Sequence, residues 1–395
     1  MPWRITDPMS ERLEFVRAAL HRQGSFRELC GRFGVSEKTG YKWLNRYALE
    51  GPAALADRSH APITPAHQVP PAQVAAICAL RRRHPTWGAR KLRVRLAVKA
   101  PGVRWPAPST ITTLLKHAGL VVSRHRRARE RQGWAHAALT QPTSANDVWA
   151  ADFKGEFRLR HGAYCYPLTV SDLYSRYVLG CRALPSTASG LAQAHFLRLF
   201  EHYGLPQVIR TDNGGPFSAA CALGGLSTLS VWWIRLGIRP ERIAKGVPQQ
   251  NGEHERMHRT LKAEATRHPA ATPEAQQRLF DRWQRVFNHE RPHEALGQTP
   301  PSAHFTPSPR PYPRRVPALA YPADAELRRV WSNGCVRWRG EPLFLSTALA
   351  GQYVALTRTT ETEWAIRFCS LQLGVYHAAA MAFEEKLAWL HTPDQ

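Results

Sequence analysis

The sequence predicts a chain of several domains: two α-helical helix-turn-helix modules, an α/β core and a small C-terminal β-barrel. Three observations support this prediction. Apolar residues at helical spacing dominate the first 140 positions, strand and helix patterns alternate from position 146, and strand-length runs separated by turns fill positions 323–383. With 395 residues, of which 43% are hydrophobic, the chain can form several cores.

The charge of the chain predicts a polyanionic partner. The sequence has 54 Lys and Arg against 30 Asp and Glu, a formal net charge of +24, and the excess is concentrated in the first third. This charge exceeds what solubility requires and favours nucleic acid. The seven cysteines form no C-x-x-C pair, and no apolar run has membrane length, so we expect a cytoplasmic protein without a membrane partner.

The first module, at positions 1–60, has the pattern of a helix-turn-helix domain. Apolar residues at helical spacing predict a helix over 10–22, and a capping box from Ser25 to Glu28 begins the second helix. Ser36 caps a third helix, which would be the recognition helix. Three of its basic residues are predicted to contact DNA: Lys38, Lys42 and Arg46. A plain three-helix bundle is the alternative.

A second helix-turn-helix and a basic linker are predicted over 61–140. Helices are expected over 71–84 and 87–96, and Ser109 or Thr110 would cap a third. The basic run that follows favours phosphate contact, because it comes after two basic helical modules. Five residues of this region are predicted to contact DNA: Arg90, Lys91, Arg124, Arg126 and Arg127.

From 141 to 300, strands and helices alternate. Three apolar runs predict an antiparallel meander of strands over 147–153, 164–171 and 177–183. A helix, a short fourth strand and further helices are expected after them, at 189–203, 207–211, 226–236, after the Asn251-Gly252 turn and at 273–288, with a possible strand at Ile238. This order is that of the ribonuclease H-like fold, in which the first and fourth strands are adjacent.

The rest of the chain is predicted to form a Pro-rich linker over 301–322 and a small β-rich domain over 323–395. Six strand-length segments with turns between them favour a small β-barrel.

Three acidic residues stand at the ends of the predicted core elements. Asp152 ends the first strand, Asp212 ends the fourth, and Glu255 begins the helix after the turn. Three carboxylates in one cleft would raise one another's pKa, a cost that a divalent cation or a pair about 4 Å apart removes. Oxygen ligands select Mg²⁺ or Mn²⁺. Such a site activates a water or a DNA 3′-OH for in-line attack at phosphorus, without a protein nucleophile.

The same helix supports other interpretations. The run His254–His258 matches H-E-x-x-H, the helix of zinc proteases. Glu255 could instead form an exposed ion pair with Arg259. Asp172 is a further candidate acid. Downstream histidines could supply a third zinc ligand: His268, His289 and His293.

Several motifs together resemble the DDE transposases of bacterial insertion sequences, in the branch whose core is similar to retroviral integrase. These motifs are Trp149–Gly155, Thr211–Gly214, Pro248–Arg256, Arg259–Lys262 and Asn288–Gly297. The resemblance implies that Asp152, Asp212 and Glu255 are both the catalytic and the metal-binding residues, with two Mg²⁺ or Mn²⁺ ions. It also implies contacts between DNA phosphates and three cations near the scissile bond: Lys154, Arg259 and Lys262.

The function implied is that of a transposase that binds terminal inverted repeats, hydrolyses DNA and joins 3′-OH ends to target DNA. Cutting two ends together implies at least a dimer on double-stranded DNA, associated with the bacterial nucleoid. A helix-turn-helix regulator or an inactive copy is the alternative. The sequence departs from the family in a longer Asp212–Glu255 interval, which an insertion at 219–230 would absorb, and this leaves Glu253 as an alternative acid. The N-terminal His/Cys zinc module of retroviral integrases is absent.

Overall fold

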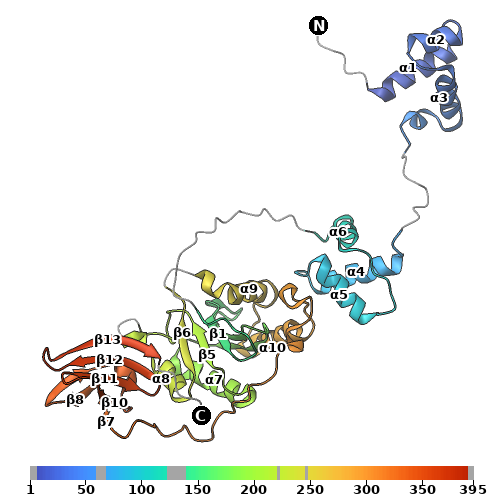
Figure 1. Cartoon of the computed structure of the whole chain (residues 1–395). Coiled ribbons are helices and arrows are strands. Elements are labelled where there is room, and N and C mark those ends of the chain that lie inside the picture. Colours follow the sequence, from blue (N-terminus) through green and yellow to red (C-terminus); the bar gives the residue numbers. More distant parts are fainter. Residues whose placement is uncertain (1–6, 59–67, 122–138, 220–222, 245–247, 390–395) are drawn as a thin grey trace. The chain divides into compact units, whose positions relative to one another are not determined.

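The computed structural model describes residues 7–58, 68–121, 139–219, 223–244 and 248–389 (Figure 1). Contacts divide the chain into two compact units, 1–70 and 71–395. The helices are α1 Pro8–Leu20, α2 Phe26–Arg32, α3 Glu37–Glu50, α4 Pro71–Arg83, α5 Ala89–Lys99, α6 Pro108–His117, α7 Ser189–Tyr203, α8 Thr228–Arg235, α9 Gly252–Leu261 and α10 Pro273–His289. The strands are β1 Val148–Phe153, β2 Phe157–Arg158, β3 Tyr164–Asp172, β4 Val178–Leu184, β5 Val208–Thr211, β6 Arg239–Arg242, β7 Glu326–Arg329, β8 Cys335–Trp338, β9 Glu341–Phe344, β10 Tyr353–Arg358, β11 Glu363–Phe368, β12 Leu371–His377 and β13 Ala382–Trp389.

The first unit contains α1, α2 and α3, as the sequence predicted. The capping box between Ser25 and Glu28 is present, and the Ser36 hydroxyl accepts a hydrogen bond from the Thr39 amide. A glycine inside a helix costs about 1 kcal/mol relative to alanine. At Gly40, however, a Cβ would lie 2.8 Å from Cys30 Sγ, so the glycine permits the close approach of α3 to α2.

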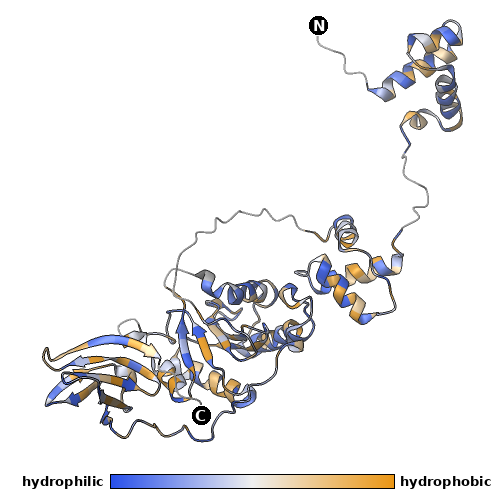
Figure 2. Ribbon diagram, in the orientation of Figure 1, coloured by the Kyte–Doolittle hydropathy of each residue, from blue (hydrophilic) through white to orange (hydrophobic). Residues whose placement is uncertain are grey.

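The second helical module, α4 to α6, has its own apolar core of Ile77, Leu80, Trp87, Leu92 and Ile111. In Figure 2 the helices of both modules carry hydrophobic and hydrophilic residues on the same helix, as expected of helices with one face in a small core. The predicted side-chain cap of α6 is wrong: Ala107 is the N-cap, and Ser109 and Thr110 lie inside the helix. Pro108 begins the helix instead, because proline already has a helical φ and no amide hydrogen to satisfy.

The core is a mixed sheet in the order β4-β3-β1-β5-β6, with β2 paired to the start of β3. β1, β3 and β4 form the predicted antiparallel meander, while β5 and β6 run parallel to β1. One hydrophobic cluster joins the sheet to α7 and α8, and another joins it to α9 and α10. The sheet therefore lies between two helical layers, and α9 is on the opposite side from α7 and α8.

The C-terminal part contains an open sheet, β13-β12-β11-β10-β7, and a separate hairpin, β8-β9. Six of these seven strands overlap the predicted segments, β13 was not predicted, and the predicted barrel is not confirmed. Within residues 326–389, the end strands β7 and β13 have no pairing that would close the sheet. One face of this sheet instead packs on residues of the core, in a cluster that includes Val231 and Ile234 of α8.

The Pro-rich segment after the core is also attached to it. The amide of Leu205 donates to the carbonyl of Arg310 at 2.7 Å, and the amide of Ser308 donates to the carbonyl of Tyr203 at 2.7 Å. Phe305 packs on the hydrophobic cluster below α7. None of the described helices has the length and hydropathy needed to cross a bilayer.

Candidate active site

The predicted acids Asp152 and Asp212 lie at the same end of two neighbouring strands. β1 pairs with β5 in parallel, with Val148 opposite Val208. Continuing this register places Asp152 level with Asp212, the residue that follows β5. The predicted adjacency of the first and fourth core strands is therefore confirmed.

The loop after β5 keeps the Asp212 carboxylate accessible. Its Oδ1 accepts a hydrogen bond from the Gly214 amide at 3.0 Å, which is a turn that aspartate favours. A Cβ at position 214 would lie 3.0 Å from Oδ2. Asn213 Nδ2 donates to the carbonyl of Ile243 at 2.8 Å and so ties this loop to the end of β6. Glycine at 214 thus avoids crowding beside the carboxylate.

The charge of Glu255, in the first turn of α9, affects the pKa of Asp152. The pKa of Asp152 is raised to about 7, first by burial, then by the charge of Asp212, with a smaller contribution from Glu255. A hydrogen bond from the Phe153 amide and the charge of Lys154 act in the opposite direction. The charges of Asp212, Glu255 and Lys154 therefore all act on the Asp152 carboxylate.

Two buried histidines attach α9 to the sheet beside these carboxylates. The Thr169 hydroxyl donates to the carbonyl of Asp152 at 3.0 Å, and it lies 2.8 Å from His254 Nε2 and 2.6 Å from His258 Nε2. A hydroxyl has a single proton to donate, so both imidazoles donate to it from Nε2. His254 Nδ1 then accepts from the Ser171 hydroxyl at 2.9 Å. Burial lowers the pKa of His254 to about 3 and that of His258 to about 2, so both are neutral.

This tautomer assignment bears on Asp152. His258 Nδ1 lies 3.7 Å from Asp152 Oδ2, and in the Nε2–H tautomer it carries a lone pair. It therefore offers no hydrogen bond to the ionised carboxylate. The histidine contributes packing on this side of Asp152 rather than charge neutralisation.

The zinc-protease interpretation of His254–His258 is not supported. Both Nε2 atoms converge on the Thr169 hydroxyl, and His254 Nδ1 accepts from Ser171, so hydrogen bonds to the sheet occupy three of the four ring nitrogens. Among the residues that the structure describes, no group of three or more His, Cys, Asp or Glu side chains is arranged to hold a metal ion, and this holds for Asp152, Asp212 and Glu255 as well as for the two histidines. The H-E-x-x-H match thus reflects two structural histidines one helical turn apart.

The donor chemistry of Asp152, Asp212 and Glu255 fits a hard divalent cation. Carboxylate oxygens are the ligands that Mg²⁺ and Mn²⁺ prefer. Burial is the first cause of the raised pKa of Asp152, and the charges of Asp212 and Glu255 add to it, so a bound cation would relieve part of this cost.

The other candidate acids have different partners. Glu253 forms an ion pair with Arg176 and does not contribute to the pKa of Asp152. Asp172 is fully buried and lies opposite Trp149, at the other end of β1 from Asp152. Its carboxylate accepts hydrogen bonds from the amides of Asn146 and Ser175, which is a structural role. The sequence also allowed an exposed ion pair between Glu255 and Arg259. Within the described residues, these two side chains form no ion pair.

The predicted recognition helix presents a mixed polar face. Lys38 and Lys42 are exposed, and Tyr41 and Asn45 lie on the same side at helical spacing. Lys42 and Arg46 both lie over the ring of Trp43, with Lys42 Nζ 4.9 Å and the Arg46 guanidinium carbon 5.0 Å from the ring centroid. The sequence analysis missed Tyr41 and Asn45, although spacing from Lys38 could have indicated them.

The remaining predicted DNA contacts occupy different surroundings. Arg90 forms an exposed ion pair with Glu294 at 3.0 Å, and Lys91 lines a cavity between α5 and α9. Arg259 and Lys262 are exposed on α9 and just after it. Three others lie outside the described residues: Arg124, Arg126 and Arg127.

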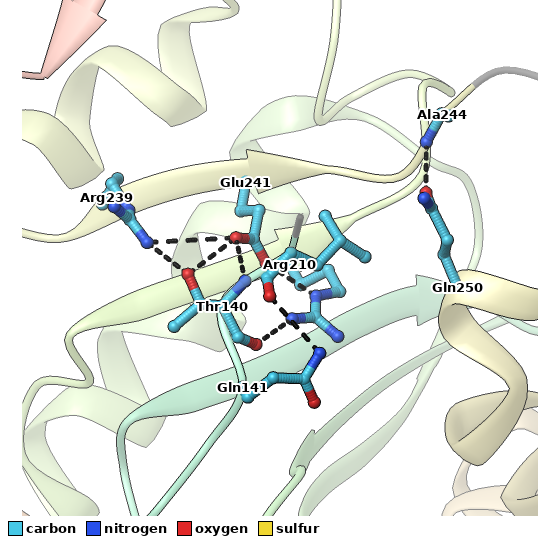
Figure 3. Close-up of polar contacts among 8 residues, drawn as sticks. Thr140, Gln141, Arg210, Arg239, Glu241, Ala244 and Gln250 are labelled. Carbon is cyan, nitrogen blue, oxygen red and sulfur yellow. Dashed lines mark hydrogen bonds and ion pairs between the residues drawn. The ribbon is translucent and has the colours of Figure 1, made fainter. Parts of the chain in front are cut away.

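A polar network fixes the chain before β1 to the far edge of the sheet (Figure 3). Arg210 Nε donates to Glu241 Oε2 at 2.7 Å, across the paired strands β5 and β6. Glu241 Oε1 accepts from both the amide and the hydroxyl of Thr140 at 2.8 Å. Arg239 also donates to the Thr140 hydroxyl. The network thus attaches Thr140 to Arg210, which precedes Asp212 by two residues on β5. No local sequence signal indicates this contact.

Comparisons with known proteins agree with this geometry. Residues 142–248 and 236–301 both match the integrase core domain family. Residues 11–63 match the helix-turn-helix domain family, and residues 39–115 match the homeodomain-like domain family.

Individual relatives cover different parts of the chain. An uncharacterized insertion element IS476 protein of Xanthomonas euvesicatoria is 29% identical over 249 residues, covering 62% of this chain and 66% of the relative. The Pol polyprotein of Feline endogenous virus ECE1 is 32% identical over 120 residues, covering 30% of this chain and 11% of the polyprotein. The chain thus spans just under two thirds of the first relative and a small part of the second.

Among solved structures, the HTLV-2 integrase catalytic core domain in complex with magnesium is 16% identical, with a TM-score of 0.34. The match covers 42% of this chain and all of that chain. The sequence matches, rather than this structural likeness, locate the integrase core at residues 142–301.

Proposed function

We propose that this chain, which belongs to the insertion-element transposases with an integrase-like catalytic core, cuts DNA at the ends of its element and joins the exposed 3′-OH groups to target DNA. One observation carries the proposal. The parallel pairing of β1 and β5 brings Asp152 level with Asp212, and Glu255 adds its charge to the same cluster.

The three acids would hold one or two Mg²⁺ or Mn²⁺ ions. Bound there, the metal lowers the pKa of the attacking water or hydroxyl and neutralises charge at the phosphate. In hydrolysis a water oxygen bonds to phosphorus, the P–O3′ bond breaks, and the leaving 3′ oxygen takes a proton. In strand transfer the exposed 3′-OH replaces water, a target P–O3′ bond breaks, and the number of P–O bonds is unchanged.

Basic residues around the acids would orient the DNA. Lys154 already acts on Asp152, while Arg259 and Lys262 are exposed on and after α9. We assign these three cations to phosphates beside the scissile bond. The exposed face of α3, with Lys38 and Lys42, would read the terminal inverted repeat in the major groove. Because two ends are cut together, the active species on the bacterial chromosome is at least a dimer.

The test is metal-dependent nicking and strand transfer on DNA that carries the ends of the element. Wild type is compared with Asp152→Asn and Asp212→Asn, and binding of the same DNA is measured by fluorescence anisotropy. We expect activity with Mg²⁺ or Mn²⁺, its loss in both variants, and retained binding in both. Specific binding without cleavage by the wild type would contradict the proposal and favour a DNA-binding regulator or an inactive copy.

A further inference from the structure

A basic cavity of about 430 Å³ lies on the flank of α9 that faces away from Glu255. Arg256 and Thr260 line it from α9, and Lys91 lines it from α5 of the second helical module. Arg176, from the turn after β3, and Arg291, after α10, complete its basic wall. At 3.6 residues per turn, the direction midway between Arg256 and Thr260 lies about 120° around α9 from Glu255. Asp152, Asp212 and Glu255 do not line the cavity, whereas Arg259, about 40° around α9 from Glu255, does.

The positive charge in this cavity is only partly balanced. Arg176 pairs with Glu253, and Arg291 donates to Glu264 at 2.8 Å. Within residues 68–121 and 139–389 as described, Lys91 and Arg256 form no ion pair. Burial, and then the charge of Arg291, lowers the pKa of Lys91 to about 8. A cation that is partly buried beside another cation is the arrangement that an anionic ligand stabilises.

A second feature of the wall is an unused polar atom. His293 Nε2 is buried and has no hydrogen-bond partner within the described structure. His293 and Lys91 both line the cavity. Leaving a buried polar atom without a partner is unfavourable, so this part of the wall is not fully satisfied by the chain's own groups.

The cavity continues into a groove. A neighbouring cavity of about 970 Å³ shares Arg176, Glu253 and Arg256 with the first. It extends to Gln141 and Arg210, both of which are labelled in Figure 3. A basic path thus runs from α5, past the start of α9, to the residues where the chain enters the core. Two adjoining cavities that share basic residues offer room for more than one phosphate of a DNA backbone.

We propose that the basic cavity binds a backbone phosphodiester of the element-end DNA between Lys91 of α5 and Arg256 of α9. This inference rests on the proposed function and assigns it a second phosphate site, which adjoins the first at Arg259. One phosphate held by both helices would connect the second helical module to the helix that carries Glu255. DNA bound by that module would then enter the core at a fixed position.

The experiment tests whether one positive charge of the protein and one phosphate of the DNA depend on each other for binding. End DNA is prepared with one neutral methylphosphonate at each position in turn, and its affinity is measured without divalent metal, so that no cleavage occurs. The proteins are wild type, Lys91→Gln, Arg256→Gln and Lys91→Arg. The matched control is Lys99→Gln, which removes an exposed charge from the same helix outside the cavity. Thermal unfolding confirms that each variant is folded.

We expect Lys91→Gln and Arg256→Gln each to weaken end-DNA binding roughly tenfold or more, and Lys91→Arg to retain most of it. One methylphosphonate position should weaken wild-type binding by a similar factor and have no further effect in either Gln variant. The Lys99→Gln control should lose as much affinity as wild type when the methylphosphonate is at that position.

Two results would overturn the inference. One is that every methylphosphonate effect persists in both Gln variants while specific binding of end DNA is intact. The other is that inorganic phosphate alone binds in a Lys91-dependent manner but does not compete with end DNA, because the cavity would then serve a free anion. Absence of any specific end-DNA binding by wild type would instead contradict the proposed function.

Discussion

The two flanks of α9 carry opposite charges, and each is incompletely neutralised. On one flank Glu255 adds to the repulsion at Asp152. On the other, Arg256 adds to the repulsion at Arg176, whose pKa is lowered first by burial and then by that neighbour. Between the two flanks, the buried face of the helix carries neutral His254 and His258. One helix thus holds a carboxylate where a cation should bind and a guanidinium where an anion should bind.

This difference shows how a site can remain open for its ligands. The face toward the sheet is fixed by uncharged hydrogen bonds to Thr169 and Ser171. Charge repulsion is confined to the two sides of the helix, where ligands of opposite sign would remove it. Substitutions on the two flanks and on the uncharged face should therefore have different effects on cleavage and stability.

The largest effect should follow from Glu255→Gln. This substitution removes one of three carboxylates from the acidic flank, and we expect DNA cleavage to fall about 1,000-fold or more. Glu253→Gln is the matched control on the same helix, because it removes only the partner of Arg176. Its cleavage rate should fall less than about tenfold. The reverse ranking would assign the third acid to Glu253.

The acidic flank should also make stability depend on pH and metal. The pKa of Asp152 is raised from 3.8 to about 7, so between these values the folded chain holds a proton that the unfolded chain has lost. The stabilisation is therefore present at low pH and is lost as pH rises toward 7. Mg²⁺ should raise the melting temperature at pH 8 more than at pH 5.5.

Asp152→Asn should stabilise the metal-free protein at pH 8, by at most about 4 kcal/mol, and should remove most of the Mg²⁺ effect. The control Asp324→Asn changes an exposed acid outside the cluster and should leave both properties unchanged. An equal Mg²⁺ effect in Asp152→Asn and wild type would show that the metal binds elsewhere.

The uncharged face can be tested with Thr169→Val, which removes the hydroxyl shared by both histidines. Two buried imidazole N–H groups would lose their acceptor, so we expect a loss of about 2–4 kcal/mol in the free energy of unfolding. Urea denaturation measures this loss. Zinc content, determined on the same wild-type sample, should be far below one ion per chain. Stoichiometric zinc that disappears with His258→Ala would restore the protease interpretation.

The smallest effects concern the ion pairs that attach α5 beside the basic flank. Arg95 pairs with Glu290 at 2.7 Å, with both side chains about three quarters buried. The Arg90–Glu294 pair is largely exposed. We expect Arg95→Gln to cost about 1–2 kcal/mol and Arg90→Gln about 0.5 kcal/mol or less. Similar losses would show that burial does not distinguish the two pairs.

Local patterns predicted much of the core. The alternation along β1 and β3 and the helical spacing in α7 depend on near neighbours in the sequence. The order of these elements then predicted that the first and fourth strands, which bear Asp152 and Asp212, would be adjacent. The capping box at Ser25 was likewise predictable, because all of its hydrogen bonds lie within four residues.

The remaining features depend on distant pairings. Thr169 is separated from His254 by 85 positions, and no local pattern indicates that contact. Polar residues at alternate positions of the otherwise apolar β3 were an available but weak signal. The barrel prediction failed for a related reason: periodicity locates strands but does not determine whether β7 and β13 meet. The cap of α6 was wrong because Pro108 provided a simpler helix start than Ser109.

The helix α8 has a consequence for any attempt to isolate the catalytic core. Leu229 and Trp233 pack into the cluster below the core sheet, whereas Val231 and Ile234 pack into the C-terminal cluster. The predicted insertion at 219–230 contributes Leu223 and Leu226 to that second cluster. A fragment ending before residue 323 would expose these four side chains to water as one hydrophobic patch. Such a fragment should aggregate, so we expect the experiments above to require the C-terminal sheet together with the core.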